Sequence, residues 1–172
     1  LHCNHFRSAT KSVLSVAEIL RKTFDRAVKL LAAKPRSVAE LRERLLRGKN
    51  IDEEVVETVI SRLREYGYLN DERLAFSYAS YKIKQKPVGR RRLERDLKLK
   101  KVDNTVANEA LEMVFAETSE EQLIDEAIAK RVRLRGKPKN RAEAKSLFDH
   151  LLRRGFAFDL VSERVRSLAT DY

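Results

Sequence analysis

The sequence predicts an all-α fold of three tandem three-helix repeats, set in an elongated array that is either straight or curved. Glycine (5 residues) and proline (3 residues) are scarce among the 172 residues, which leaves little material for hairpins and tight turns and so favours helices. Hydrophobic residues make up 42% of the chain, enough to bury a core. They also follow one spacing three times, which indicates internal repeats.

The repeated spacing consists of two leucines four residues apart, followed by four apolar residues at offsets of 0, 4, 9 and 12. The three sets are Leu41, Leu45, Ile51, Val55, Ile60 and Leu63; Leu93, Leu97, Val102, Val106, Leu111 and Val114; and Leu147, Leu151, Phe156, Leu160, Val165 and Leu168. This spacing places the side chains on one side of a helix. Each set therefore predicts a short and a longer helix that share a core.

A further helical segment precedes each set and completes a three-helix unit. These opening helices are predicted at 25–33, 71–83 and 120–135. The predicted units are an N-terminal extension at 1–25, partly disordered, and repeats at 26–71, 72–120 and 121–172.

Helix starts carry capping signals. The pairs are Ser37 with Glu40, Ser119 with Gln122, and Asn140 with Glu143. A side-chain oxygen at the N-cap and a Glu or Gln three residues later satisfy two backbone donors that lack helical partners. Pro35 and Pro138 lie just upstream, where the chain leaves one helix before it starts the next.

The joint between repeats 1 and 2 reads GYLND. Gly67 is expected to end a helix in the left-handed conformation, and Tyr68 and Leu69 are expected to fold back as apolar anchors. Asn70 or Asp71 then caps the next helix.

This joint resembles the signature of the RecX family of regulatory proteins. Similar matches to the family are RAVKLLAAKPRSVAELRERL at 26–45, GRRRLERDL at 89–97 and LLRRGF at 151–156. Together they cover residues 26–170 in order. One departure is Lys101, which stands where the family usually has the glycine of a Lys-Gly-Ile-like turn. Either Lys101 adopts the left-handed conformation at some steric cost, or the turn takes another form.

The resemblance implies an all-helical protein without enzymatic activity or cofactor. RecX-like proteins bind filaments of the recombinase RecA on single-stranded DNA and restrain its ATPase and strand exchange. The expected roles are RecA regulation, including its coprotease activity, in recombination, DNA repair and the SOS response. Expected partners are RecA, single-stranded DNA and, as a further ligand, double-stranded DNA. An alternative is a free-standing DNA-binding protein of the helix-turn-helix kind, because three-helix units also place recognition helices in the major groove.

Charge supports a polyanionic partner independently of the resemblance. The chain has 37 Lys and Arg against 26 Asp and Glu, a net charge of +11. Residues 82–101 contain ten basic and two acidic residues, and residues 130–141 contain seven basic and none acidic. Candidate contacts to RecA or DNA are Lys82, Lys84, Lys86, Arg90, Arg91, Arg95, Lys98, Arg133, Arg135, Lys137, Lys139 and Arg141.

Helical geometry separates the roles of these cations. If Leu93 and Leu97 face the core, Arg91, Arg95 and Lys98 face outward. The two acids of this helix have basic partners four residues upstream, in the pairs Arg90–Glu94 and Arg92–Asp96. The basic residues that end the helix at 120–135 also interact with its dipole, so a structural role and a binding role both stay open for that cluster.

Aromatic residues near the basic segment suggest stacking on bases, but core packing is the favoured interpretation. Leu74, Tyr78 and Tyr81 have the spacing of core residues on one helix, and Tyr68 and Phe76 lie close by.

Other functional classes lack support. The single Cys3 excludes an intramolecular disulfide framework and fits the cytoplasm. Apolar runs are too short to span a membrane. The HCNH segment at 2–5 lacks a second ligand cluster, and His150 has no second His or Cys near it, so no metal is expected. No P-loop or nucleophile elbow is present, and a non-enzymatic monomer is expected.

Overall fold

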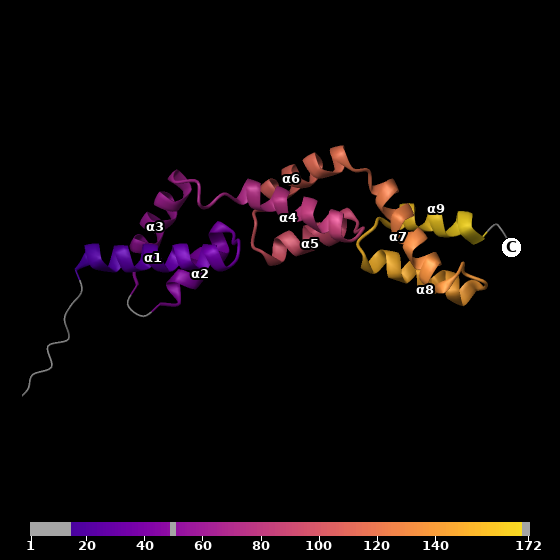
Figure 1. The fold of residues 1–172 in the computed structure, drawn as a ribbon, viewed down its shortest axis with the longest axis horizontal. Coiled ribbons are helices and arrows are strands. Elements are labelled where there is room, and N and C mark those ends of the chain that lie inside the picture. Colours follow the sequence, from indigo (N-terminus) through magenta and orange to yellow (C-terminus); the bar gives the residue numbers. More distant parts are fainter. Residues whose placement is uncertain (1–14, 49–50, 170–172) are drawn as a thin grey trace, which may run out of the picture.

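The computed structural model describes residues 15–48 and 51–169, and all regular secondary structure in these residues is helical. The helices are α1 (Val16–Ala33), α2 (Val38–Leu46), α3 (Glu53–Glu65), α4 (Asp71–Gln85), α5 (Arg90–Leu99), α6 (Asn104–Glu117), α7 (Glu120–Arg135), α8 (Arg141–Arg153) and α9 (Phe158–Ala169). Figure 1 shows an elongated array with α1–α3 (repeat 1) at one end, α4–α6 (repeat 2) in the middle and α7–α9 (repeat 3) at the other end. The predicted all-α fold of three-helix repeats is confirmed.

Helix starts follow the predicted caps. The side chains of Ser37, Ser119 and Asn140 accept hydrogen bonds from the backbone N–H groups three residues later, at 3.1, 3.2 and 2.9 Å. One boundary differs from expectation. Helix α1 begins at Val16, where Ser15 and Glu18 form a reciprocal capping box, so residues 16–25 belong to repeat 1 and not to an extension. The rest of the expected extension, residues 1–14, lies outside the described residues.

The apolar core is divided between the repeats. In repeat 1 it has its own buried cluster, which includes Leu41, Leu45 and Leu63. Repeats 2 and 3 share a second, continuous cluster that runs from Ala75 to Val165. The third helix of each repeat contacts its first helix. Repeat 1 is therefore a unit with its own core, joined to the rest by specific contacts.

The third helices bury a wider stripe than the sequence spacing predicts. Val56, Ala107 and Val161 are buried, whereas the neighbouring Val55, Val106 and Leu160, which the spacing selects, are half-buried. The shift is the same in all three repeats. It arises because each third helix packs against both other helices of its repeat, which turns more of its circumference inward.

Three turns of one kind link helices in the array. After α3, α5 and α8 the chain passes through a left-handed residue: Gly67 (φ 70°), Lys101 (φ 57°) and Gly155 (φ 89°). In each turn the following N–H bonds to the carbonyl oxygen of the helix residue five positions earlier, as in Val102 N to Leu97 O at 3.2 Å. Lys101 therefore adopts the left-handed conformation without a glycine.

Candidate nucleic-acid and protein interface

The outward stripe of α5 has the geometry that the sequence predicts. Leu93 and Leu97 are fully buried, and Arg91, Arg95 and Lys98 are exposed. Among residues 15–48 and 51–169, no carboxylate forms an ion pair with these three cations. We call Arg91, Arg95 and Lys98 the outer stripe. It presents unneutralised positive charge to solvent, which is the electrostatic condition for binding a polyanion.

Arg90 differs from the outer stripe. Its guanidinium pairs with Glu94 at 3.2 Å, as predicted, and also with Glu112 of α6 at 2.8 Å. The second predicted pair is present too, with Arg92 Nε 3.1 Å from Asp96 Oδ1. Arg90 therefore ties α5 to α6, and most of its charge is already compensated within repeat 2.

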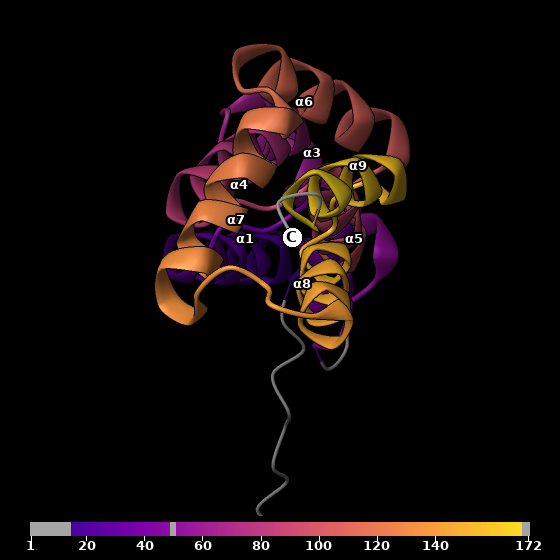
Figure 2. The same cartoon turned by 90° about the vertical axis from the view of Figure 1, so that its right-hand side faces the viewer.

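The two basic segments occupy equivalent places in repeats 2 and 3. Each covers the end of the first helix and the loop that follows. The segment at 82–101 continues through all of α5, whereas that at 130–141 stops at the first residue of α8. Figure 2 shows the loop at 136–140 joining the ends of α7 and α8 on the side of the molecule away from α6. Seven further candidates are exposed, namely Lys84, Lys86, Arg133, Arg135, Lys137, Lys139 and Arg141. Lys82 is half-buried against Tyr78.

The aromatic candidates divide into packed and exposed residues. Phe76 and Tyr78 pack against the core as expected, but Tyr81 is 58% exposed, so the core assignment of Tyr81 is wrong. Tyr68 is 62% exposed and does not anchor the joint, whereas Leu69 is 3% exposed and packs in the core of repeat 1. The backbone explains the difference, because after Gly67 the chain runs outward at Tyr68 and inward at Leu69.

The remaining GYLND residues start α4 and link the repeats. The Asn70 side chain accepts from Arg73 N at 2.6 Å and is the cap. Asp71 has another role, since its Oδ1 accepts from Val38 N, at the start of α2, at 2.9 Å. Burial raises the pKa of Asp71, and the bond from Val38 partly offsets the increase. The joint signature thus contains one residue that caps a helix and one that crosslinks two repeats.

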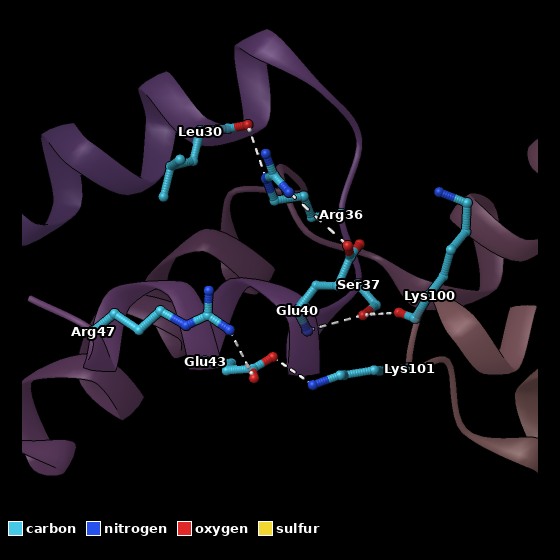
Figure 3. A network of polar contacts seen from close by, with 8 residues as sticks. All are labelled: Leu30, Arg36, Ser37, Glu40, Glu43, Arg47, Lys100 and Lys101. Carbon is cyan, nitrogen blue, oxygen red and sulfur yellow. Dashed lines mark hydrogen bonds and ion pairs between the residues drawn. The ribbon is translucent and has the colours of Figure 1, made fainter.

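The joint between repeats 1 and 2 contains a polar network that the sequence did not predict (Figure 3). Ser37, fully buried, caps α2 and also donates its hydroxyl to the carbonyl oxygen of Lys100 at 2.5 Å. Lys101 pairs with Glu43 of α2, and Glu43 also pairs with Arg47 at 3.1 Å. The hydrogen bond from Lys101, followed by that from Arg47, lowers the pKa of Glu43. The capping pattern identified Ser37, but nothing in the sequence indicated its second bond.

The joint between repeats 2 and 3 uses the same positions. Gly89 precedes α5 as Ser37 precedes α2, and Gly89 N donates to the carbonyl oxygen of Arg154 at 3.0 Å. A Cβ on Gly89 would lie 2.4 Å from backbone atoms of repeat 3, so only glycine fits there. Glu120 corresponds to Asp71, because its carboxylate accepts from Arg90 N at 3.0 Å and burial raises its pKa. Both joints therefore connect equivalent positions, through the Ser37 hydroxyl in the first joint and the Gly89 N–H in the second.

Metal and membrane sites receive no support from the described helices. In residues 15–48 and 51–169, no three or more His, Cys, Asp or Glu side chains are grouped so that they could hold a metal. The HCNH segment lies outside the described residues. His150 accepts a hydrogen bond from Arg154 Nε at 3.1 Å, and burial followed by the charge of Arg154 lowers its pKa. None of the described helices is long and apolar enough to cross a membrane.

Comparison with known families gives one match in each of the first two repeats. The family model described as "RecX, first three-helix domain" matches residues 24–63, and "RecX, second three-helix domain" matches residues 70–111. The first range begins within α1 and ends within α3, and the second runs from the cap of α4 into α6.

Curated relatives agree with the family matches. "Regulatory protein RecX" of Amycolatopsis mediterranei is 32% identical over 146 residues, which are 83% of this chain and 82% of the relative. The protein of that name from Prosthecochloris aestuarii is 30% identical over 88% of this chain and 96% of the relative. The Bacillus velezensis protein is 35% identical over 83% of this chain, but the match covers only 54% of that relative. The chain thus spans about half the length of the Bacillus relatives.

Solved structures support the fold. The crystal structure of RecX from Lactobacillus salivarius has a TM-score of 0.77 with this chain at 21% identity, and covers 90% of this chain and 99% of the other. A second structure, of "regulatory protein RecX", has a TM-score of 0.72 at 21% identity.

Proposed function

The chain belongs to the RecX family of regulatory proteins, and from this premise we propose that it binds the RecA filament on single-stranded DNA. Binding would restrain the ATPase, strand-exchange and coprotease activities of RecA, in recombination, DNA repair and the SOS response. Such a regulator acts in the cytoplasm, as a monomer and without a cofactor. The supporting observation is that repeats 2 and 3 carry basic segments at equivalent places along one elongated molecule.

The physical argument rests on uncompensated charge. The outer stripe has no carboxylate partner among the described residues, and Lys84, Lys86, Arg133 and Arg135 are exposed. Clustered basic charge on an extended surface attracts nucleic acid and releases counterions when it binds. A filament of RecA on DNA offers such a long polyanion together with a protein surface.

The alternative of a free-standing helix-turn-helix protein is less well supported. A recognition helix contacts base edges with its N-terminal residues. The N-terminus of α2 is held by Asp71, and that of α5 by Glu120 and by the carbonyl oxygens of Arg154 and Gly155. These two helix starts lie in the joints, so α2 and α5 are not available to enter a major groove as recognition helices.

Binding to the assembled filament tests the proposal. Labelled protein would be titrated in parallel with RecA filaments on single-stranded DNA, with bare single-stranded DNA and with RecA alone. We expect tightest binding to the filament, because only the filament offers protein and phosphate surfaces together. Equal affinity for filament and bare DNA would favour the free-standing DNA-binding protein instead.

A further inference from the structure

The loops between the first and second helices share a dipeptide. All 3 prolines of the chain follow lysine, as Lys34-Pro35, Lys86-Pro87 and Lys137-Pro138, and the lysines recur after 52 and 51 residues. Each dipeptide lies in the loop that ends at the start of α2, α5 or α8. The first two of these loops are at joints, so the repeat places a lysine at both joints.

At the joint between repeats 1 and 2 (joint 1), Lys34 lies near two cations of repeat 2. The Lys100 ammonium lies 4.7 Å from the centroid of the Tyr78 ring, and the Lys82 ammonium lies 5.4 Å from the same centroid. The Tyr78 hydroxyl donates to Asp96 Oδ2 at 3.1 Å, which fixes the ring. We call Lys34, Lys82 and Lys100 joint cluster 1; its members come from α1, α4 and α5 or their ends.

Nearby carboxylates offset the positive charge of joint cluster 1 only in part. Burial lowers the pKa of Lys100, and the positive charge of Lys34 lowers it further. Glu40 lies 3.9 Å from Arg36, and its charge partly offsets the lowering of the Lys100 pKa. Asp96 pairs with Arg92 at 3.1 Å. In the described part of the chain, Lys34, Lys82 and Lys100 form no ion pair. Tyr78 adds no charge, because burial and then Asp96 raise its pKa to about 12.

The joint between repeats 2 and 3 (joint 2) carries cations at the equivalent positions. Arg154 ends α8 as Lys100 ends α5, and Arg131 has the same place in α7 as Lys82 has in α4. Arg154 Nη1 donates to the carbonyl oxygen of Pro87 at 2.9 Å, which brings this guanidinium beside the Lys86-Pro87 loop. Arg131 and Arg154 are both close enough to affect His150. We call Lys86, Arg131 and Arg154 joint cluster 2.

We propose that joint clusters 1 and 2 each bind phosphate groups of one single-stranded nucleic acid that runs along the array. A nucleic acid fits because it offers phosphates at regular intervals. The two clusters likewise occupy equivalent positions in the two successive joints of the array. The clusters contain none of the outer-stripe residues, so they would extend the binding surface across both joints. The choice of single-stranded DNA as ligand rests on the proposed function.

The salt dependence of DNA binding without RecA tests the clusters. A fluorescent oligo-dT of 30 nucleotides would be titrated with the wild type, with K34Q/K82Q/K100Q and with K86Q/R131Q. The slope of log affinity against log salt should flatten by about 2 for the first variant and about 1.4 for the second, at about 0.7 per phosphate contact. The control R21Q/K22Q/K29Q removes three exposed charges from α1 and should leave the slope unchanged.

Folding and competing outcomes are separable. If thermal unfolding shows that the triple variant is destabilised, K82Q/K100Q replaces it, with an expected flattening of about 1.4. Wild-type slopes in the joint variants, or an equal loss in the α1 control, would overturn the proposal. So would a variant that keeps its slope on DNA but loses affinity for RecA, since that marks an acidic protein partner. Flattened slopes in a protein without effect on RecA would instead refute the proposed function alone.

Discussion

Lys101 occupies a position where the equivalent turns of repeats 1 and 3 have glycine. Its φ of 57° is close to the 70° of Gly67, and the hydrogen bonds of the two turns are the same. A side chain in this conformation costs about 1–2 kcal/mol. Lys101 regains part of this cost through its ion pair with Glu43 across joint 1. The departure from the family pattern thus places a strained residue in the turn and gains an ion pair between repeats.

Substitutions at Lys101 separate the two effects. Lys101→Ala removes the ion pair and keeps the strain, so it should lower the free energy of unfolding by less than about 1 kcal/mol. Lys101→Gly removes both and should be about 1 kcal/mol more stable than the alanine variant. Urea unfolding of the three proteins measures both differences. A glycine variant no more stable than the alanine variant would mean that position 101 is unstrained.

Tyr68 and Leu69 are neighbours with opposite environments, which gives a second prediction. Leu69→Ala should cost about 2–5 kcal/mol of unfolding free energy, because it leaves a cavity in the core of repeat 1. Tyr68→Ala should cost less than about 1 kcal/mol, because that ring is 62% exposed and meets Tyr66 edge to face. Comparable losses in the two variants, measured by urea unfolding, would contradict this assignment.

Element starts and ends could be predicted well from sequence because they depend on local chemistry. Ser37, Ser119 and Asn140 cap helices as predicted, since a cap needs only a side chain and a backbone three residues away. The buried stripe of the third helices is wider than the spacing predicts and includes Val56, Ala107 and Val161, because two neighbouring helices decide its width. Tyr81 was misassigned for a similar reason: its spacing suits a core, but no neighbouring helix covers it.

The turns after α3 and α8 differ in what surrounds them. Gly67 has open space around it, whereas a Cβ on Gly155 would lie 2.3 Å from Arg92 N of repeat 2. Gly67→Ala should therefore cost only the left-handed strain of about 1–2 kcal/mol. Gly155→Ala should cost a further 1–3 kcal/mol, roughly, from overpacking at joint 2. Equal stabilities of the two variants in thermal or urea unfolding would show that the packing at joint 2 relaxes around a Cβ without loss of stability.

Asp71 and Glu120 accept hydrogen bonds from the starts of α2 and α5, and they predict a pH dependence of stability. Burial raises the pKa of Asp71 and of Glu120, so their contribution to stability is present below the ordinary carboxyl pKa of about 4 and is lost as pH rises through the raised value. Asp71→Asn and Glu120→Gln keep an acceptor oxygen without the charge. Their stability relative to the wild type should therefore increase from about pH 4 to neutral pH.

Glu121 provides a control of opposite sign on the same helix. Its own backbone N–H, and then the Ser119 side chain, lower its pKa, so its contribution is present at neutral pH and is lost as pH falls. Glu121→Gln should lose stability relative to the wild type as pH rises. Urea unfolding at several pH values compares the variants, and parallel curves for Glu120→Gln and Glu121→Gln would contradict the assigned environments.

At the scale of the whole molecule, the sequence indicated the repeats and the basic segments but not how the repeats meet. Periodicity predicts a helix from residues a few positions apart, whereas joint 1 pairs Ser37 with Lys100, 63 residues away. The bonds of Asp71 and Glu120 to the preceding repeat are likewise invisible in local patterns. The sequence marks the joints with the GYLND segment and with the Lys-Pro dipeptide, which recurs with the repeat, but neither pattern identifies the bonded partners.

These joints give the array its functional shape. They hold three small units in line, so that basic segments of repeats 2 and 3 lie along one molecule (Figure 1). An extended ligand such as a filament would then be contacted at several points, each individually weak. The outer stripe is the part of this surface that the sequence and the structure support together.

Inhibition of RecA tests this account most directly. ATP hydrolysis by RecA on single-stranded DNA would be measured against increasing wild-type protein, R91Q/R95Q/K98Q and the α1 control R21Q/K22Q/K29Q. We expect inhibition by the wild type and the control at the same concentrations, and at least about tenfold more of the stripe variant for the same effect, as three lost phosphate contacts would require. No inhibition by the wild type at any ratio, or equal inhibition by the stripe variant, would contradict the account.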